Sequence, residues 1–454
     1  MLKENALSRR TAVGSLGSLI VPRHVLGGPG YQAPSDTLTI AGVGVGGMGR
    51  GYLGNFRDEH IVAMCDVDPE GYASRAFRAF PQAKMYRDYR EMFDKENFDA
   101  VVIAVPDHWH AMIIMESLRR RKHIYCAKPL THTLHELRTV MEAEREAKVA
   151  TQTSIQTCAS DHACTTAEIL MSGAIGAVRE VHLWTDHPWE PAAMRRPAET
   201  PPAPKGLDWD RWIGPAPYRP YHPIYHPWNW RAWWDFGEGT VGDMACHLIH
   251  VFYDALKLVP PAVVQGRRSR MREGTFRLTE AGRDILPVEV ATPETESCSS
   301  MVTWDFPERE GMPPLRVHWY DGGLCPPRPP EMNLKAQMPV EGSMYIGEKG
   351  VLLTGDRGRF SLLPEDRFRD FVLPPKTLTR SIGHYREWIE AAKGGKPASC
   401  PFSFGGRLTE LALLGAVAAR TARVLEWDSK NLTFTNDSEA NALINPPYRS
   451  GYAL

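Results

Sequence analysis

A glycine-rich turn near the start of the chain constrains its fold more than any other feature. The stretch LTIAGVGVGGMGRGYL passes from an apolar strand into Gly44-x-Gly46-x-x-Gly49 and then into a helical pattern. The first glycine permits the tight turn, the second lets the backbone approach a pyrophosphate, and the third lets the helix pack on the strand. Free N–H groups at the helix N-terminus would face the phosphate charge. The contacts predicted from this turn are Gly44, Val45, Gly46, Gly47, Met48 and Gly49.

An acidic residue stands at the position that a dinucleotide site requires. The second apolar stretch, HIVAMCDVD, ends at Asp66, 22 residues after Gly44. A carboxylate there can accept hydrogen bonds from the ribose hydroxyls of adenosine. Because it would also repel a 2′-phosphate, Asp66 favours NAD over NADP. Glycine-rich turns without this role exist, but the strand, the helix and the acid together predict dinucleotide binding.

The alternation of strand and helix continues beyond this unit. The sequence predicts strands over 100–105 and 123–126, with a helix between them. Ligands in such sheets lie at the carboxyl ends of the strands, so Val105, Pro106 and Lys128 should face the nicotinamide. His108 and His110 open the helix after Pro106. We interpret His108 as a cap or surface residue, and for His110 both a structural and a cofactor-binding role stay open.

Composition bounds the broad class. The chain has 454 residues, 43% hydrophobic and 24% charged, which is typical of a soluble globular protein with two or three domains. Its 53 Lys and Arg nearly balance 54 Asp and Glu, so charge gives no reason to expect a nucleic acid or an anionic membrane as partner. Eight scattered cysteines without a CxxC pair argue against a disulfide framework or a zinc ribbon.

The first residues have a different character. SRRTAVGSLGSLIVPRHVLGG contains the twin arginines Arg9 and Arg10 before a short apolar stretch. That stretch is too short to span a bilayer. It predicts a twin-arginine export signal and linker over residues 1–33, and hence a periplasmic or cell-envelope location. The alternative is a disordered tail. No clear A-x-A site follows, so cleavage stays open.

The pattern changes after about residue 155. We therefore predict a dinucleotide-binding domain over 34–155 and a substrate-binding α+β domain over 156–454, with antiparallel strands in segments such as PLRVHWYDG. A Trp- and Pro-rich loop over 186–234 lies in the second domain. Eight of the 13 tryptophans fall between Trp184 and Trp234. Flat aromatic rings suit sugar faces, although a small core that holds the loop is the alternative.

One helix in this domain carries a polar face. After three glycines, Asp243, His247 and His250 follow at i, i+4 and i+7, while apolar residues form a separate stripe. This pairing favours a catalytic role for His247 over a structural one. His222 with His226, or His247 with His250, have usable metal-ligand spacing, but no HExxH motif or acidic cluster supports them, so we expect no metal. The substrate contacts predicted from the loop and this helix are Trp184, His226, Arg231, Trp234 and His250.

With these motifs in order, the chain resembles the Gfo/Idh/MocA family, the glucose-fructose oxidoreductase and inositol dehydrogenase group. VPDHWH, GDMACH and IVPRHVLGG resemble its exported members. The resemblance implies an NAD(P)-binding Rossmann domain, a doubly wound parallel sheet, followed by an α+β domain with a large, mostly antiparallel open sheet. That sheet often mediates dimers or tetramers, so a homodimer or homotetramer is expected.

The resemblance also implies roles for single residues. The usual E-K-P motif falls on Ala127-Lys128-Pro129, which makes Lys128 the catalytic lysine; the D-x-x-x-H pair falls on Asp243 and His247; the P-x-x-x-H segment falls on Pro106 and His110. Two departures are present, because Ala127 replaces the glutamate and His250 stands where close members have an acid.

These residues predict an NAD-dependent oxidoreductase that acts on a sugar or glycoside hydroxyl. His247 would be the general base, Asp243 its orienting partner and Lys128 the electrostatic stabiliser of the substrate oxygen. A redox-neutral, NAD-dependent glycoside hydrolase is the first alternative. A non-catalytic NAD-binding sensor or subunit is the second, suggested by the departures at Ala127 and His250.

Overall fold

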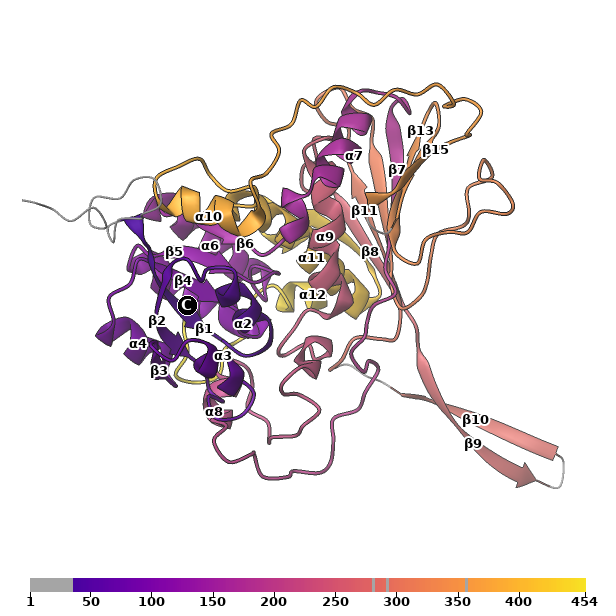
Figure 1. The fold of residues 1–454 in the computed structure, drawn as a ribbon. Coiled ribbons are helices and arrows are strands. Elements are labelled where there is room, and N and C mark those ends of the chain that lie inside the picture. Colours follow the sequence, from indigo (N-terminus) through magenta and orange to yellow (C-terminus); the bar gives the residue numbers. More distant parts are fainter. Residues whose placement is uncertain (1–35, 280–281, 291–293, 356–357) are drawn as a thin grey trace, which may run out of the picture.

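A computed structural model describes residues 36–279, 282–290, 294–355 and 358–454 (Figure 1). The predicted export signal over 1–33 lies outside the described residues, so it stays a prediction. No helix in the described part of the chain has both the length and the apolar character that a membrane span requires.

The N-terminal half contains a six-stranded parallel sheet in the order β3–β2–β1–β4–β5–β6. Its strands are β1 Thr39–Val43, β2 His60–Cys65, β3 Lys84–Tyr86, β4 Ala100–Ile103, β5 His123–Cys126 and β6 Thr151–Thr153. The helices that connect them are α2 Gly47–Gly54, α3 Ser74–Ala79, α4 Tyr89–Lys95, α5 His110–Arg119 and α6 Leu134–Ala147. Because helices cover both faces, the central strand β4 is apolar and buried at every position.

A capping box fixes the chain just after Lys128. At the start of α6 the Glu136 backbone N–H donates to the Thr133 hydroxyl (3.1 Å), and the Glu136 carboxylate accepts from the Thr133 backbone N–H (3.0 Å). Two N–H groups that the helix cannot satisfy internally are thereby paired. The loop from β5 to α6 therefore has a defined end, which helps hold the lysine in place.

The second half builds a nine-stranded mixed sheet in the order β15–β14–β13–β7–β12–β11–β8–β16–β17. Its strands are β7 Val178–Trp184, β8 Val263–Arg268, β11 Ser300–Phe306, β12 Leu315–Tyr320, β13 Gly342–Gly347, β14 Val351–Thr354, β15 Phe360–Leu363, β16 Val424–Asp428 and β17 Thr433–Phe434. The β7–β12 pair is parallel and the other recorded pairs are antiparallel. A separate ribbon of β9 Met271–Thr279 and β10 Gly282–Val290 stands apart in Figure 1.

Helices cover one face of the large sheet and separate it from the parallel sheet (Figure 1). The remaining helices are α7 Asp161–Met171, α8 Trp209–Ile213, α9 Gly239–Tyr253, α10 His384–Ala392, α11 Phe402–Thr421 and α12 Ser438–Ala442, with short 3₁₀ turns η2 Asp107–Trp109, η3 Gln156–Ala159 and η4 Asn229–Ala232. Phe252 of α9 packs edge-on against Tyr345 of β13 (ring centroids 5.7 Å apart), and Trp304 of β11 donates to the Leu411 carbonyl of α11 (3.1 Å). One continuous apolar core therefore joins both sheets.

The predicted fold class is confirmed: a parallel Rossmann sheet is followed by a mixed, mostly antiparallel sheet. One feature of the packing was not anticipated. Trp388 of α10, from the C-terminal part of the chain, is fully buried against Phe56 and Tyr125 of the parallel-sheet domain, with ring centroids 5.0 and 5.6 Å away. The chain thus returns to complete the core of its first domain.

Candidate cofactor and substrate site

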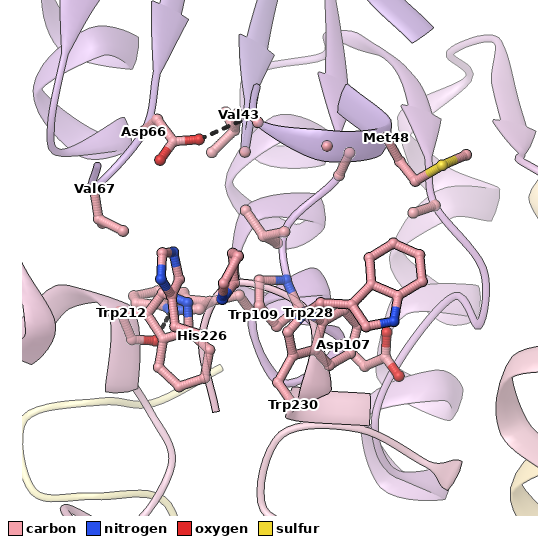
Figure 2. A pocket seen from close by; sticks show the side chains of 18 of the residues that line it. Val43, Met48, Asp66, Val67, Asp107, Trp109, Trp212, His226, Trp228 and Trp230 are labelled. Carbon is pink, nitrogen blue, oxygen red and sulfur yellow. Dashed lines mark hydrogen bonds between the residues drawn. The ribbon is translucent and has the colours of Figure 1, made fainter. Parts of the chain in front are cut away.

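A cavity of about 320 Å³ opens at the carboxyl ends of β1, β2, β4 and β5. The strand ends form one wall, the Trp- and Pro-rich loop forms the opposite wall, and α9 contributes part of the lining. Figure 2 shows Asp66, Val43 and Met48 on one side and Trp228 and Trp230 on the other. The position agrees with the rule that parallel sheets hold ligands at the carboxyl ends of their strands.

The glycine turn has the shape that its sequence predicts. Gly44 has φ +73°, and a Cβ on it would lie 2.7 Å from the Ala104 backbone. A Cβ on Gly46 would lie 2.6 Å from the Tyr72 ring, and one on Gly49 would lie 1.9 Å from the Gly44 carbonyl oxygen. Side chains at these positions would therefore fill the turn or push α2 away from β1. Tyr72 lines the cavity beside the turn and was not predicted from the sequence.

Asp66 organises the turn as well as lining the cavity. Its Oδ2 accepts hydrogen bonds from the backbone N–H groups of Val45 (2.9 Å) and Gly46 (3.2 Å), and its Oδ1 accepts from Asp68 N–H (2.9 Å). Burial raises the pKa of Asp66. Val45 and Gly49 are buried behind the turn and are not among the described residues that line the cavity, so they support it from behind.

Lys128 meets a carboxylate on α9. Its ammonium donates to the Asp243 carboxylate and to the Asp243 backbone carbonyl (2.7 Å). The Arg231 Nε lies 3.6 Å from Asp243 Oδ1 and 3.8 Å from Glu190 Oε1. Burial alone would raise the pKa of Asp243, but Lys128 and Arg231 outweigh it and hold that pKa well below its usual range. The carboxylate is therefore ionised and shared between two cations.

His247 lies one helical turn beyond Asp243 and lines the same cavity. Burial, followed by the charge of Lys128, lowers the pKa of His247 to about 3. The imidazole is therefore neutral at ordinary pH, the form in which one ring nitrogen keeps a free lone pair. In the described part of the chain, Asp243 forms ion pairs with Lys128 and Arg231. The sequence predicted instead that Asp243 orients His247. The Asp243 charge still raises the pKa of His247.

Asp107 is an acidic lining residue that the sequence analysis missed. It follows Pro106 at the carboxyl end of β4, and its side chain lies at the cavity (Figure 2). Burial and the neighbouring Asp243 raise the pKa of Asp107 well above its usual range, against the opposing effect of Arg231. Its place directly after a parallel strand was the available signal, because such ends meet at the ligand site.

The aromatic loop residues surround Arg231. The guanidinium carbon lies 4.3 Å from the Trp228 ring and 4.4 Å from the Trp230 ring. At the mouth, Trp189 is 68% exposed and stacks on His187 with ring centroids 4.0 Å apart. Trp228, which is 41% exposed, therefore offers a flat ring beside an anchored cation, a surface that a sugar face can stack on.

The predicted site residues divide into two groups. Among the described residues, the cavity is lined by Gly44, Gly46, Gly47, Met48, Asp66, Val105, Pro106, Lys128, His226, Arg231, Asp243 and His247. It is not lined by Val45, Gly49, His110, Trp184, Trp234 or His250.

Several of the predicted residues that do not line the cavity have structural roles. The His110 ring nitrogens lie 2.8 Å from the Pro129 carbonyl and 2.9 Å from the Val105 carbonyl, so this buried ring links the loops after β5 and β4. His108, predicted to be a cap or surface residue, is buried and contacts the Trp212 and Phe236 carbonyls. Trp184 donates to the Pro339 carbonyl (2.9 Å) within a satellite core of the large sheet. Trp234 lines a second, smaller cavity, and His250 is buried.

Fold and cavity together define a Rossmann-fold protein whose second half contributes residues to the cavity at the strand ends. A family model described as "Oxidoreductase family, NAD-binding Rossmann fold" matches residues 38–154, and the model of its C-terminal alpha/beta domain matches 172–257 and 385–454. These matches cover more than half of the chain. The chain belongs to the Gfo/Idh/MocA oxidoreductase family.

Relatives in this family include sugar dehydrogenases. Inositol 2-dehydrogenase of Rubrobacter xylanophilus is 32% identical over 151 residues, which is 32% of this chain and 43% of that protein. Levoglucosan dehydrogenase of Pseudarthrobacter phenanthrenivorans is 26% identical over 172 residues, 33% of this chain and 44% of that protein. A glycosyl hydrolase family 109 protein of Shewanella pealeana is 28% identical over 144 residues, 28% of this chain and 32% of that protein. The chain thus spans less than half the length of each of these relatives.

A solved structure supports the fold over most of the chain. The WlbA dehydrogenase of Bordetella pertussis, in complex with NADH and UDP-GlcNAcA, superposes with a TM-score of 0.58 and covers 86% of this chain and 99% of that one, at 15% sequence identity. At this identity the similarity establishes the shared two-domain fold.

Proposed function

We propose that this protein oxidises a hydroxyl group of a sugar or glycoside, with NAD as its tightly bound cofactor. The observation that carries the proposal is the meeting of Lys128, Asp243 and His247 in the cavity that also exposes the glycine turn. The polar groups for proton transfer and charge stabilisation thus lie next to the groups that hold a dinucleotide.

The residues of the turn fit NAD. The N–H groups at the start of α2 and the absence of side chains at Gly44 and Gly46 suit a pyrophosphate, and Asp66 can accept from ribose hydroxyls. Because Asp66 would repel a 2′-phosphate, NAD is preferred to NADP. When bound, NAD supplies the acceptor for the hydride that leaves the substrate carbon.

Side chains of the protein supply proton transfer, charge stabilisation and orientation. The neutral imidazole of His247 accepts the proton of the substrate hydroxyl. The Lys128 ammonium stabilises the negative charge that develops on that oxygen. Asp243 fixes the direction of the lysine through two hydrogen bonds, and the charges of Lys128 and Arg231 keep the Asp243 carboxylate ionised.

Location and assembly belong to the same proposal. The twin arginines predict export in a folded state, and NAD is expected to be scarce outside the cytoplasm. An exported enzyme would therefore keep its NAD bound and regenerate it in place. We also propose that the protein forms a homodimer or homotetramer through its large sheet, as the family resemblance implies.

A redox-neutral glycoside hydrolase is the second candidate, and the similarity to glycosyl hydrolase family 109 proteins favours it. In that reaction the sugar is transiently oxidised, which acidifies the neighbouring C–H. The aglycone is eliminated, water adds, and the sugar is reduced again. The net reaction is hydrolysis and needs no external oxidant, which suits an exported enzyme.

One experiment separates these functions. The full chain is purified, its cofactor is identified by mass spectrometry, and a panel of sugars and glycosides is scored for keto-sugar and for free aglycone. We expect NAD and a keto-sugar product; aglycone release without keto-sugar would favour the hydrolase instead. His247→Gln should lower turnover by about 10²- to 10⁴-fold, whereas the exposed His60→Gln serves as the matched control. Bound NAD without turnover of any compound in the panel would favour the non-catalytic alternative, and turnover that is unchanged in Lys128→Met would contradict the role given to Lys128.

A further inference from the structure

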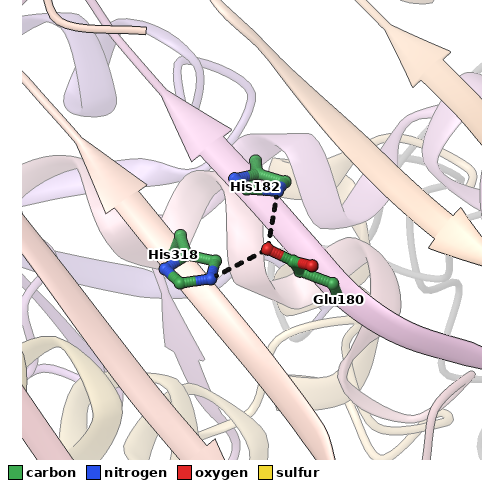
Figure 3. Close-up of side chains that lie close together, drawn as sticks. All are labelled: Glu180, His182 and His318. Carbon is green, nitrogen blue, oxygen red and sulfur yellow. Dashed lines mark ion pairs between the residues drawn. The ribbon is translucent and has the colours of Figure 1, made fainter. Parts of the chain in front are cut away.

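A second group of polar side chains lies on the large sheet, away from the cavity. His182 of β7 and His318 of β12 are direct neighbours in the parallel pairing of these strands. Glu180 precedes His182 by two residues and so projects from the same face of β7. The apolar neighbours Val181 and Val317 point to the opposite face and belong to the main core. The register of two strands therefore places two imidazoles and a carboxylate together (Figure 3).

The donor atoms of this group converge. His182 Nε2 and His318 Nε2 each lie 3.1 Å from the same oxygen, Glu180 Oε1. The two rings are stacked, with centroids 4.8 Å apart and an angle of 17° between their planes. A tetrahedral ion with ligand bonds of about 2.0–2.1 Å holds its ligand atoms about 3.3 Å apart. The two N–O separations are close to that value before any side chain moves, and one ligand atom from each of the three residues lies within 4.8 Å of the others.

The outer ring nitrogens are already held in place. His182 Nδ1 lies 3.0 Å from the Tyr320 hydroxyl, and His318 Nδ1 lies 3.0 Å from the Thr303 hydroxyl. A hydroxyl can donate or accept, so each can pair with either tautomer of its histidine. When Nδ1 carries the proton and donates outward, the Nε2 lone pair is free for a metal. Metal-binding histidines commonly have such an outer partner, which fixes the ring orientation.

The charge of the group also suits a cation. Arg316 stands opposite Glu180 in the β7–β12 pairing, and its guanidinium donates to Asp305 through a 2.6 Å hydrogen bond. Glu180 supplies the acidic ligand of the group, because its carboxylate faces the two rings while the Arg316 guanidinium pairs with Asp305.

We propose that Glu180, His182 and His318 form a binding site for a divalent transition-metal ion, with Zn²⁺ as the best-matched ion. Two imidazoles and one carboxylate match the ligand preference of Zn²⁺ rather than that of Mg²⁺ or Ca²⁺. In the single chain the Glu180 side chain is 41% exposed, which leaves room for a fourth ligand. None of the three residues is among the described residues that line the main cavity, so the site is separate from the proposed oxidoreductase site.

Zinc binding to the untagged, full-length protein tests this site. The protein is treated with a chelator, dialysed and titrated with Zn²⁺ by calorimetry, and Co²⁺ is used as a spectroscopic probe of coordination. We expect one tight equivalent per chain and a Co²⁺ visible spectrum typical of four-coordinate sites. His318→Gln and Glu180→Gln should each weaken that equivalent by about 10²-fold or more, since loss of an outer partner alone costs about 10- to 100-fold.

Two further variants separate a metal site from a structural hydrogen-bond cluster. Thr303→Val keeps the side-chain shape but removes the hydroxyl beside His318 Nδ1, and it should weaken Zn²⁺ binding by about 10- to 100-fold. His60→Gln removes an exposed histidine elsewhere and should leave the tight equivalent intact. Circular dichroism and cofactor content should match the wild type in every variant used. Wild-type protein without a tight Zn²⁺ equivalent, or equal affinity in wild type, His318→Gln and Glu180→Gln, would overturn the proposal.

Discussion

Gly49, the third glycine of the turn, gives the sharpest test of how the turn holds helix α2 against β1. Alanine at Gly49 would place its Cβ 1.9 Å from the Gly44 carbonyl oxygen, whereas real Cβ atoms stay beyond about 3.0 Å from such atoms. The neighbouring atom is backbone and not a flexible side-chain end. Helix α2 must therefore move away from β1 by more than an ångström, and the N–H groups of the turn must move with it.

The structure sets the size of the effect. Overpacking of this kind costs about 1–3 kcal/mol, which lowers Tm by roughly 2–4 °C per kcal/mol in a domain of 150–250 residues. Because the turn shifts, NAD affinity should fall by about 10-fold or more, which corresponds to at least ~1.4 kcal/mol.

Gly51→Ala is the matched control on the same helix. A Cβ on Gly51 meets no described atom within 4 Å, so this change adds only helix propensity and should stabilise the protein by about 0.5–1 kcal/mol. If the close contact matters, thermal unfolding should show a lower Tm for Gly49→Ala and a higher Tm for Gly51→Ala, and NAD titration should show weaker binding for Gly49→Ala alone. Similar Tm values and equal NAD affinities in the two variants would refute the reasoning.

Three further outcomes follow from single side chains. Asp66→Ser removes the charge that opposes a 2′-phosphate, so competitive titration should show the preference for NAD over NADP fall by about 10-fold. Burial raises the pKa of Glu296 to about 8, above its unfolded value of about 4.3, so its stabilisation is complete below that lower pH and is lost as pH rises toward 8. Glu296→Gln still accepts from Thr240 N–H, which lies 2.7 Å away, and its Tm should fall less between pH 5 and pH 8 than that of the wild type; parallel curves would contradict this. Ala127→Glu places a second carboxylate beside Lys128 and should change the pH dependence of turnover or the amount of NAD retained; identical profiles would make the alanine a neutral variation.

The sequence was sufficient for the parts of the fold that depend on local pattern. The strand–turn–helix unit at Gly44 and the apolar run of β4 identify a parallel sheet because burial on both faces leaves a continuous apolar signature. The lining positions Asp66, Pro106 and Lys128 follow from the same rule, since each lies just beyond a strand of that sheet.

Features that depend on long-range packing were not visible. Tyr72 reaches the cavity from the segment before α3, and Arg231 lies beside Asp243 only because the loop folds back onto α9. Tryptophans illustrate the limit well. Trp184 and Trp228 belong to one composition cluster, yet the first is buried in the large sheet and the second is 41% exposed beside the cavity. Composition gives the number of tryptophans, but tertiary contacts decide which of them are exposed to solvent.

The group formed by Glu180, His182 and His318 was not predicted from the sequence, for a related reason. Glu180 and His182 stand two residues apart, but His318 is 136 positions beyond His182 and meets it only through the pairing of β7 with β12. Spacing rules for metal sites detect ligands on one helix or one short loop. The candidates with such spacing, including His222 with His226, were therefore the ones that sequence reasoning could consider.

Ala127 stands next to Lys128 in the chain, so the effect of a glutamate at this position depends on the contacts of that lysine. Lys128 binds the carboxylate of Asp243, and the Arg231 Nε lies 3.6 Å from the same carboxylate. A glutamate at position 127 would therefore compete with Asp243 for one ammonium and add a second negative charge near the buried Asp107. On this reasoning Ala127 leaves Lys128 directed toward α9 and His247, where a substrate oxygen would need it. A structure of Ala127→Glu in which Lys128 still binds Asp243 unchanged would contradict this account.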